Sequence, residues 1–460
     1  MANLIVTNTN DSGSGSLRDT IAKAQAGDLI TFAHNLANQT ITLSSGQLVV
    51  NKNLIIDGAQ TPGLTISGNN ASRVIEMQNA INFSLKNVTI ANGKVAGADE
   101  ATGAGGGLRG SDGSTLNLEY CTFKNNVASW AGAIYTGFKS TNIVNNCTFD
   151  GNNGTSGKSE RGAGAIATKS AGSLTVKSST FTNNKGINGG AINSLLGILT
   201  VDSCIFTKND TTAGVFGTGT IGYGGAIYTD GANASGPNSG HGPVGGKVTI
   251  SNSRFDGNKG AGQGGGLFLF VYPPDTILVE GCQISNNQVI KDSKGDALGG
   301  GLRIGNGEYT ISKTKFFQNI ALSQGGAFWV GETSPGTIID STFSGNKAYE
   351  TTPDGKSNGL GGAIAFITGS PVKMSNCVVM QNHAGFQGGA FWGGGTHITL
   401  TNSIVAYNKA ENGGNPWDVK HHTGAQFNDG GGNTQWPAKN AYDPNDVNIT
   451  KNATIAEPKL

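Results

Sequence analysis

Residues Cys121–Asn152 read CTFKNNVASWAGAIYTGFKSTNIVNNCTFDGN. The stretch holds two copies of a Phe-x-x-Asn motif, Phe123…Asn126 and Phe149…Asn152, which lie 26 residues apart. Between them stands a second motif, a pair of small residues followed by an aliphatic one, Gly132-Ala133-Ile134. A period of about 26 residues with two or three short strands is the size of one coil of a β-helix, and no amphipathic run here is long enough for a helical repeat.

The two motifs alternate along most of the chain. The closest copies of the small-pair motif lie 26 residues apart, and the others carry roughly 1 to 14 extra residues. The small-pair motif occurs at Gly106-Gly107-Leu108, Gly132-Ala133-Ile134, Gly164-Ala165-Ile166, Gly190-Ala191-Ile192, Gly225-Ala226-Ile227, Gly265-Gly266-Leu267, Gly300-Gly301-Leu302, Gly326-Ala327-Phe328, Gly362-Ala363-Ile364 and Gly389-Ala390-Phe391. The Phe-x-x-Asn motif ends at Asn126, Asn152, Asn184, Asn209, Asn258, Asn319 and Asn346, with weaker copies ending at Asn287, Asn382 and Asn408. Coils stacked about 4.8 Å apart pair each strand with its equivalents in the next coils. The sequence therefore predicts an all-β fold, a single-stranded right-handed parallel β-helix.

Three residue types have expected structural roles in this repeat. We expect the motif glycines to permit backbone angles that a side chain would forbid at a coil corner. We expect the asparagines to tolerate left-handed turns and to form an amide ladder along the axis. The cysteines share one slot, two residues before the second motif's apolar residue, that Ser or Thr fills in other coils, so we interpret them as small buried fillers; they are Cys121, Cys147, Cys204, Cys282 and Cys377. Cys121 and Cys147 lie on neighbouring coils and could pair under oxidising conditions.

The ends of the chain depart from the repeat. Residues 1–36 are predicted to form an N-terminal cap with a short amphipathic helix over Ser16–Ala24, in which Ser16 is the N-cap. Residues 37–408 are predicted to hold the coils, and residues 409–460, where the period fails, a C-terminal capping segment. We expect the three parts to form one continuous domain.

Composition limits the classes of partner. Glycine supplies 74 of 460 residues and charged residues only 13%, and the formal net charge is +1. No basic patch suited to nucleic acid is present, and no apolar run is long enough to span a bilayer. The N-terminus lacks the pattern of a cleavable signal peptide. A polysaccharide or a cell-surface protein fits these features better as a partner.

One row of residues is not explained by core packing. The residue after each first motif should point outward, because side chains alternate along a strand. That row reads Arg109, Tyr135, Ala167, Asn193, Tyr228, Phe268, Arg303, Trp329, Ala365 and Trp392. Aromatic faces stack on sugar rings or fill protein interfaces, and arginine pairs with the carboxylates of acidic sugars. We predict ligand binding by Tyr135, Tyr228, Phe268, Arg303, Trp329 and Trp392; the alternative is that insertions cover the row as a secondary core.

Catalytic candidates are weaker. A lyase on this fold would need an Arg or Lys base and carboxylates on adjacent coils that hold Ca²⁺, the one cofactor the sequence allows for. Arg303, Glu308, Glu332 and Asp340 fall on neighbouring coils, but the offsets of Glu308 and Glu332 differ, and solvated surface charges are the competing interpretation. A hydrolase would use paired acids such as Asp230 and Asp275.

A further polar cluster lies near the C-terminus. His421-His422 could supply one metal ligand, because adjacent strand residues face opposite ways, but a loop surface is the favoured interpretation and no metal site is predicted.

The paired motifs resemble the repeats of chlamydial polymorphic outer-membrane proteins, and the opening VTNTNDSGSGSLR resembles the start of many bacterial surface-associated β-helix proteins. The resemblance implies a location outside the cell or on its surface, and it is consistent with an excised passenger portion of a longer protein. It is specific for fold and not for function. The first hypothesis is a non-catalytic binder of glycans or proteins that uses the exterior row. The alternatives are a lyase or C5-epimerase on acidic polysaccharide in the same groove, with Arg303 as base, and a purely structural rod.

Overall fold

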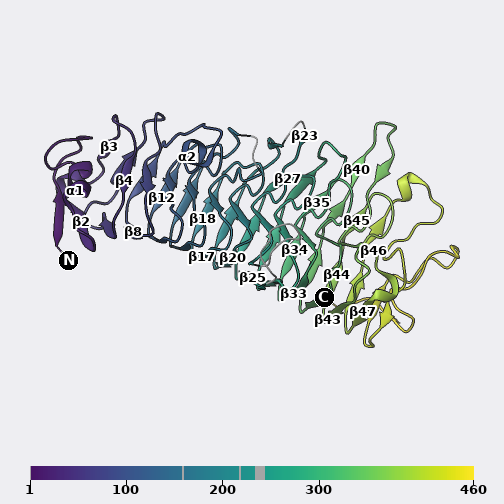
Figure 1. Cartoon of the computed structure of the whole chain (residues 1–460). Coiled ribbons are helices and arrows are strands. Elements are labelled where there is room, and N and C mark those ends of the chain that lie inside the picture. Colours follow the sequence, from purple (N-terminus) through teal and green to yellow (C-terminus); the bar gives the residue numbers. More distant parts are fainter. Residues whose placement is uncertain (1, 158–159, 217–218, 234–243, 460) are drawn as a thin grey trace. The chain divides into compact units, whose positions relative to one another are not determined.

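The computed structural model describes residues 2–157, 160–216, 219–233 and 244–459. The chain divides into two compact units, Met1–Thr218 (unit 1) and Gly219–Leu460 (unit 2). In each unit successive coils contribute, in chain order, one strand to each of three parallel sheets that we name A, B and C (Figure 1). The chain is thus an all-β parallel solenoid of about 14 turns with few helices.

From β2 (Asp28–Phe32) to β21 (Ile205–Thr207), the short strands of unit 1 rotate strictly among the three sheets. Sheet A is formed by β1 (Asn3–Val6), β2 (Asp28–Phe32), β5 (Leu54–Asp57), β8 (Asn82–Lys86), β11 (Thr115–Glu119), β14 (Thr141–Asn145), β17 (Ser173–Lys177) and β20 (Ile198–Asp202). Sheet B is formed by β3 (Thr40–Thr42), β6 (Thr65–Ser67), β9 (Thr89–Ala91), β12 (Thr122–Lys124), β15 (Thr148–Asp150), β18 (Thr180–Thr182) and β21 (Ile205–Thr207). Sheet C is formed by β4 (Leu48–Val50), β7 (Ile75–Met77), β10 (Leu108–Arg109), β13 (Ile134–Tyr135), β16 (Ile166–Thr168) and β19 (Ile192–Leu195). The other elements are helices α1 (Leu17–Lys23) and α2 (Glu100–Gly103), the 3₁₀ turn η1 (His34–Leu36) and strand β22 (Val215–Phe216).

Unit 2 repeats the pattern and adds a fourth small parallel sheet, D. Sheet A is formed by β25 (Lys247–Ser251), β29 (Thr276–Glu280), β33 (Glu308–Ser312), β37 (Gly336–Ile339), β43 (Val372–Ser375), β47 (Ile398–Thr401) and β50 (Asn428–Asp429). Sheet B is formed by β26 (Arg254–Asp256), β30 (Gln283–Ser285), β34 (Lys315–Phe317), β38 (Thr342–Ser344), β44 (Val378–Met380), β48 (Ile404–Ala406), β51 (Thr434–Trp436) and β52 (Thr454–Ile455). Sheet C is formed by β24 (Ile227–Asp230), β28 (Leu267–Phe270), β32 (Leu302–Gly305), β36 (Phe328–Gly331), β42 (Ile364–Phe366) and β46 (Phe391–Gly393). Sheet D is formed by β27 (Lys259–Ala261), β31 (Gln288–Ile290), β35 (Ile320–Ala321), β39 (Lys347–Ala348), β45 (His383–Ala384) and β49 (Lys409–Ala410). The other elements are β23 (Gly219–Thr220), the hairpin of β40 (Glu350–Thr351) with β41 (Ser357–Asn358), and the 3₁₀ turns η2 (Gly395–His397) and η3 (Asn412–Gly414).

The Phe-x-x-Asn motif supplies the interior of both units. In unit 1 the rings of Phe123, Phe149, Phe181 and Phe206 stack in succession, with centroids 5.2, 4.6 and 4.7 Å apart. Beside them Asn152 Nδ2 donates to Asn184 Oδ1 at 2.9 Å, and the same bond links the asparagines from Asn126 to Asn209 in unit 1 and from Asn258 to Asn408 in unit 2. The amide ladder predicted from the sequence is confirmed, and it holds adjacent coils in register.

The expectation that these asparagines also adopt left-handed turns is wrong. The positive φ belongs to the residue just before each ladder asparagine, such as Asn125 (φ 54°), Asn183 (φ 56°) and Lys208 (φ 55°). The turn therefore precedes the ladder residue, whose side-chain amide bonds to the next coil.

The reason why glycine is required in the first motif also differs from the one expected. At Gly326 φ is ordinary, and the positive φ of 64° belongs to Gly325. A Cβ on Gly326 would lie 2.6 Å from Lys347 N and would collide with the carbonyl oxygen of Gly362, both backbone atoms of following coils. Glycine is needed here because neighbouring backbones approach closely at the corner, not because of a forbidden backbone angle.

The cysteine slot is a buried one, as predicted. All five cysteines are free thiols and are buried. In several coils the backbone N–H of the slot residue donates to the slot side chain of the next coil: Cys121 N to Cys147 Sγ at 3.4 Å, and Cys147 N to Ser179 Oγ at 3.0 Å. Burial raises the pKa of Cys204 to about 11, so its thiol stays protonated at neutral pH.

Helix α1 forms where the sequence predicted it. Ser16 Oγ accepts from Asp19 N at 3.2 Å and caps its N-terminus. Leu17 and Ile21 are buried as the helix packs against β1 and β4. Within the residues the structure describes, no helix has the length and apolarity to cross a bilayer.

Candidate functional site: the outer face of sheet C

The outward row of sheet C has the register that the sequence predicted. In unit 1 Arg109 pairs with Glu76 on one side and Tyr135 on the other, and Tyr135 pairs with Ala167. In unit 2 the paired positions are Tyr228, Phe268, Arg303, Trp329, Ala365 and Trp392. Residues far apart in sequence thus become neighbours about 4.8 Å apart on one face in each unit.

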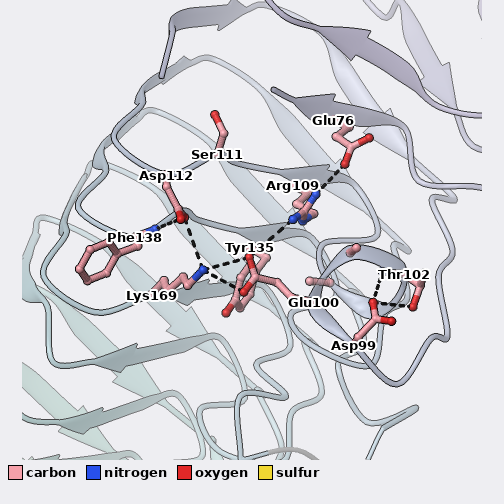
Figure 2. A network of polar contacts seen from close by, with 12 residues as sticks. Glu76, Asp99, Glu100, Thr102, Arg109, Ser111, Asp112, Tyr135, Phe138 and Lys169 are labelled. Carbon is pink, nitrogen blue, oxygen red and sulfur yellow. Dashed lines mark hydrogen bonds and ion pairs between the residues drawn. The ribbon is translucent and has the colours of Figure 1, made fainter. Parts of the chain in front are cut away.

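In unit 1 this face carries a network of charges (Figure 2). Arg109 Nη1 lies 2.6 Å from Glu76 Oε1, and its Nη2 lies 3.6 Å from Glu100 Oε1. Lys169 Nζ lies 3.0 Å from Glu100 Oε2 and 3.4 Å from Asp112 Oδ1. Glu100, from α2, thus joins Arg109 of β10 to Lys169, which follows β16, as the dashed lines of Figure 2 show.

A surface pocket of about 380 Å³ opens beside this network. Its lining consists of Glu76, Met77, Gln78, Asn79, Ala80, Glu100, Arg109, Gly110, Ser111 and Asp112. Asp112 has a side chain 60% exposed, whereas Glu76 is 12% exposed and Arg109 22%. The pocket therefore offers carboxylate acceptors and guanidinium donors at graded depths, an arrangement suited to a ligand with many hydroxyl groups.

A buried arginine holds α2 over the face. Arg73 Nη2 donates to Ala101 O at 2.6 Å and its Nε to Ala104 O at 3.1 Å, while Nη1 donates to Gln47 Oε1 at 2.7 Å. Burial lowers the pKa of Arg73 to about 10, and the nearby Glu76 opposes that shift. The guanidinium therefore stays charged at neutral pH and fixes the segment that carries Glu100.

Lys169 is also cationic in this network. Its partial burial disfavours the charge, but the hydrogen bond and the attraction of Glu100, with a contribution from Asp112, outweigh that cost and leave the pKa of Lys169 raised.

Tyr135 does not form part of an open surface. Its side chain is fully buried, its ring lies 5.9 Å from that of Trp130, and it packs with a cluster of alanines. Arg161 Nη1 donates to its hydroxyl at 3.2 Å, and burial raises the pKa of Tyr135. The expectation of exposure is wrong at this position because insertions between the coils cover it.

In unit 2 the same face is an aromatic and cationic stack. The Tyr228 and Phe268 rings stack at 4.9 Å, and the Arg303 guanidinium carbon lies 4.7 Å from the centre of Phe268 and 5.0 Å from that of Trp329. Tyr228, Phe268, Arg303 and Trp329 are 8, 6, 4 and 7% exposed. These side chains point outward as predicted, but they are covered. The prediction that they form an open binding surface is therefore wrong, and the alternative of a secondary core under the insertions describes them.

Glycines two residues further along the strands make room for this stack. A Cβ on Gly305 would collide with Arg303 Nη1, and one on Gly331 would lie 2.6 Å from Trp329 Cζ3. Both side chains therefore lie flat along the sheet instead of standing out from it, which explains how such large groups are covered. Trp329 Nε1 is satisfied by Gln324 Oε1 at 3.1 Å.

Trp392 differs from the rest of the predicted binding residues because it is partly exposed. The chain returns over one side of its ring, and a Cβ on Gly424 would lie 2.7 Å from Trp392 Cε3. The other predicted aromatic side chains are all less than a tenth exposed, so Trp392 is the one of them whose ring is most open to a ligand.

The catalytic candidates are only partly brought together. Arg303 Nη2 donates to Glu332 Oε1 at 2.6 Å, which confirms that these two residues meet. Glu308 begins β33 in sheet A, and Asp340 follows β37 in the same sheet, where Asn376 Nδ2 donates to its carboxylate at 3.0 Å. Burial lowers the pKa of Arg303, and the ion pair with Glu332 opposes that shift.

The paired acids named for a hydrolase have separate structural settings. Asp275 Oδ2 accepts from Ala232 N at 2.6 Å in a buried turn. Asp230 is half-buried and burial raises its pKa, against a hydrogen bond from Tyr272. Nothing in these contacts places the two across a groove.

The histidine pair is also resolved. His422 is buried, its Nε2 lies 3.0 Å from Pro437 O, and burial lowers its pKa to about 4. His421 Nδ1 accepts from Ala410 N at 3.3 Å. Across the described ranges, no three His, Cys, Asp or Glu residues gather to hold a metal ion.

Sequence reasoning missed the charged residues of the unit 1 pocket other than Arg109. Glu76 belongs to the outward row, one coil before the first small-pair motif, but its coil reads Arg73-Val74-Ile75 and lacks the glycines that mark the motif. Glu100, Asp112 and Lys169 lie in insertions or turns that share no period. Extending the row back by one coil from Arg109 would have found Glu76.

Known proteins share this architecture. Residues 269–436 match the family model of the right-handed β-helix region, and residues 120–137 match that of the Chlamydia polymorphic membrane protein repeat. No curated protein matches the sequence. Similar solved structures include tailspike protein 3 of bacteriophage CBA120 (10% identity, TM-score 0.47, 96% of this chain and 59% of that one) and the periplasmic alginate epimerase AlgG (11%, 0.42, 92% and 82%). Another is a GH87 α-1,3-glucanase from Streptomyces thermodiastaticus (12%, 0.36, 91% and 70%).

The chain thus spans less than two thirds of the tailspike protein it resembles. The segment that matches the chlamydial repeat, residues 120–137, contains one copy of each motif, Phe123…Asn126 and Gly132-Ala133-Ile134. The chain is a parallel β-solenoid, of which residues 269–436 are similar to the right-handed β-helix family and residues 120–137 to the polymorphic membrane protein repeat.

Proposed function

We propose that this chain is a cell-surface or secreted β-helix that binds a glycan on the outer face of sheet C and acts as a binding protein, not as an enzyme. The observation that carries the proposal is the pocket of about 380 Å³ beside Glu76, Glu100, Arg109 and Asp112. Its volume is within the range of about 300–1,000 Å³ usual for small-ligand sites. Carboxylate oxygens accept from sugar hydroxyls, and Arg109 and Lys169 donate to them.

The charges of the pocket favour a ligand rich in hydroxyl groups. Its carboxylates are already paired with cations, so a strongly charged ligand would have to break ion pairs to enter. Hydroxyl groups can instead bridge a carboxylate and a guanidinium without displacing either. In unit 2 we propose that Trp392 contacts a sugar ring directly, since stacking on an indole suits the apolar face of a sugar. Helix α1 is proposed to cover the open edge of the first coil, as solenoid ends require.

The test is a binding measurement with the full chain. A glycan array identifies the ligand, and calorimetry then compares wild type with the double variant Glu100→Gln and Asp112→Asn, which removes two acceptor charges from the pocket. Loss of two hydrogen bonds to charged groups should weaken binding at least about tenfold. Glu119→Gln is the matched control, because Glu119 is 40% exposed and ion-paired in the same unit but lies on sheet A.

The control variant should bind as wild type does. If the folded double variant binds the glycan as tightly as wild type does, the unit 1 pocket is not the binding site. If no glycan on the array is bound by the wild type, the structural-rod alternative replaces the proposal.

A further inference from the structure

Arg303 has an unusual environment for a guanidinium. It is 4% exposed, and both of its faces are covered by the Phe268 and Trp329 rings at 4.7 and 5.0 Å. Stacking satisfies the faces of the group but not its N–H edges. In the part of the chain that the structure describes, Nε and Nη1 have no hydrogen-bond acceptor.

A single bond serves the edge of this group. Nη2 donates to Glu332 Oε1 at 2.6 Å, and the second oxygen of that carboxylate makes no matching bond to Arg303. Arginine and carboxylate normally meet in a bidentate pair, with two parallel bonds. Here a planar cation is held between aromatic rings with most of its donors unused, which costs stability unless another acceptor can reach it.

Glu332 is placed so that it can leave. Its side chain is 38% exposed, and it lies at a left-handed turn just after β36 (φ 49°). Its departure would open the Nη2 edge of Arg303 to solvent. The rings of Phe268 and Trp329, with Gly305 beneath the guanidinium, would keep Arg303 in place.

We propose that Arg303 is a carboxylate receptor for an acidic glycan and that Glu332 occupies it in the free protein. The ligand class is a uronate, since a planar carboxylate matches the guanidinium edge and a sugar acid carries it together with hydroxyl groups. A bidentate uronate satisfies a nitrogen that Glu332 leaves without an acceptor. This inference rests on the proposed glycan-binding function and names the charged group that unit 2 recognises.

The proposal that Glu332 competes with the ligand for Arg303 leads to a distinctive prediction. Glu332→Gln keeps the size of the side chain but removes the charge of the acceptor, so the ion pair becomes a weaker bond from Arg303 to a neutral carbonyl oxygen. The ligand then meets a weaker competitor, so trigalacturonate should bind about five- to tenfold more tightly to Glu332→Gln than to wild type. Most substitutions near a site weaken binding, so a gain is a specific outcome.

The experiment is calorimetry of the full chain with trigalacturonate and with its methyl ester. Arg303→Met should abolish the preference for the free acid, and Glu308→Gln is the matched control, since Glu308 is an exposed glutamate of the same coil on sheet A. Circular dichroism establishes that each variant is folded. If Arg303→Met does not fold, the comparison of Glu332→Gln with wild type decides the question.

Unchanged or weaker binding by Glu332→Gln would overturn the inference, as would equal affinity for acid and ester. In either case glycan binding at the unit 1 pocket would stand, because the ester and neutral glycans would still bind there. If a short poly-glutamate peptide binds as tightly as trigalacturonate, the site recognises carboxylates in general and the inference that its ligand is a glycan is wrong.

Discussion

Asn319→Ala should destabilise unit 2 by about 3–6 kcal/mol, one of the two largest effects expected for a single substitution. Asn319 Oδ1 accepts from both Asn287 N and Asn287 Nδ2, at 3.1 and 2.9 Å. Its Nδ2 donates to Ile284 O at 2.8 Å and to Asn346 Oδ1 at 2.9 Å. Alanine leaves two or three of these groups buried without partners, each at a cost of about 1–3 kcal/mol.

The effect should be local as well as large, because the stability of a solenoid is close to a sum over neighbouring repeats. Urea unfolding measures the loss, and hydrogen exchange should show faster opening in residues 284–290 and 316–321 than elsewhere in unit 2. Lys315→Ala, an exposed change on the same coil, should stay within about 0.5 kcal/mol of wild type. A loss below about 1 kcal/mol for Asn319→Ala would show that the ladder contributes little.

Gly326→Ala should have a comparable effect for a different reason. The new methyl would be 2.6 Å from Lys347 N and 2.5 Å from Lys347 C, and would meet the Gly362 carbonyl oxygen even more closely. These are backbone atoms in a hydrogen-bonded ladder, so no side chain can turn aside. Overpacking of this kind costs about 3 kcal/mol or more, and the urea midpoint of the variant measures it.

Gly369→Ala is the control for Gly326→Ala, since nothing lies within 4 Å of the position its Cβ would take. It should leave stability unchanged or raise it by about 0.4–1 kcal/mol, as the unfolded chain loses freedom. If both substitutions are equally tolerated, close backbone approach is not the reason for the glycine.

The register of the coils could be predicted from the sequence because the structure is periodic. Once Phe123…Asn126 and Phe149…Asn152 are aligned, every equivalent residue is assigned to a neighbour, and the observed pairing of Arg303 with Trp329 follows. The ladder asparagines were found for the same reason. The alternation of side chains along a strand also correctly predicted that the residues after the small-pair motif point outward from sheet C.

Burial of that row could not be predicted, because the covering segments have no period. Tyr223, whose ring stacks on Phe268 at 5.2 Å, lies in an insertion. Trp130, whose ring lies against Tyr135, belongs to a coil of the shortest spacing but to neither motif. The glycines that let Arg303 and Trp329 lie flat, Gly305 and Gly331, lie two residues past the motif. Charge pairs across insertions, such as Lys169 with Glu100, depend on the folded path of the loop and leave no spacing in the sequence.

The central claim is that the outer face of sheet C is where this protein binds its ligand. Hydrogen exchange of the full chain, with and without a saturating concentration of the glycan that binds most tightly, tests it directly. The account predicts slower exchange in residues 74–80 and 99–113, which surround the unit 1 pocket. Protection confined to strands of sheets A and B, or none while calorimetry records binding, would contradict it.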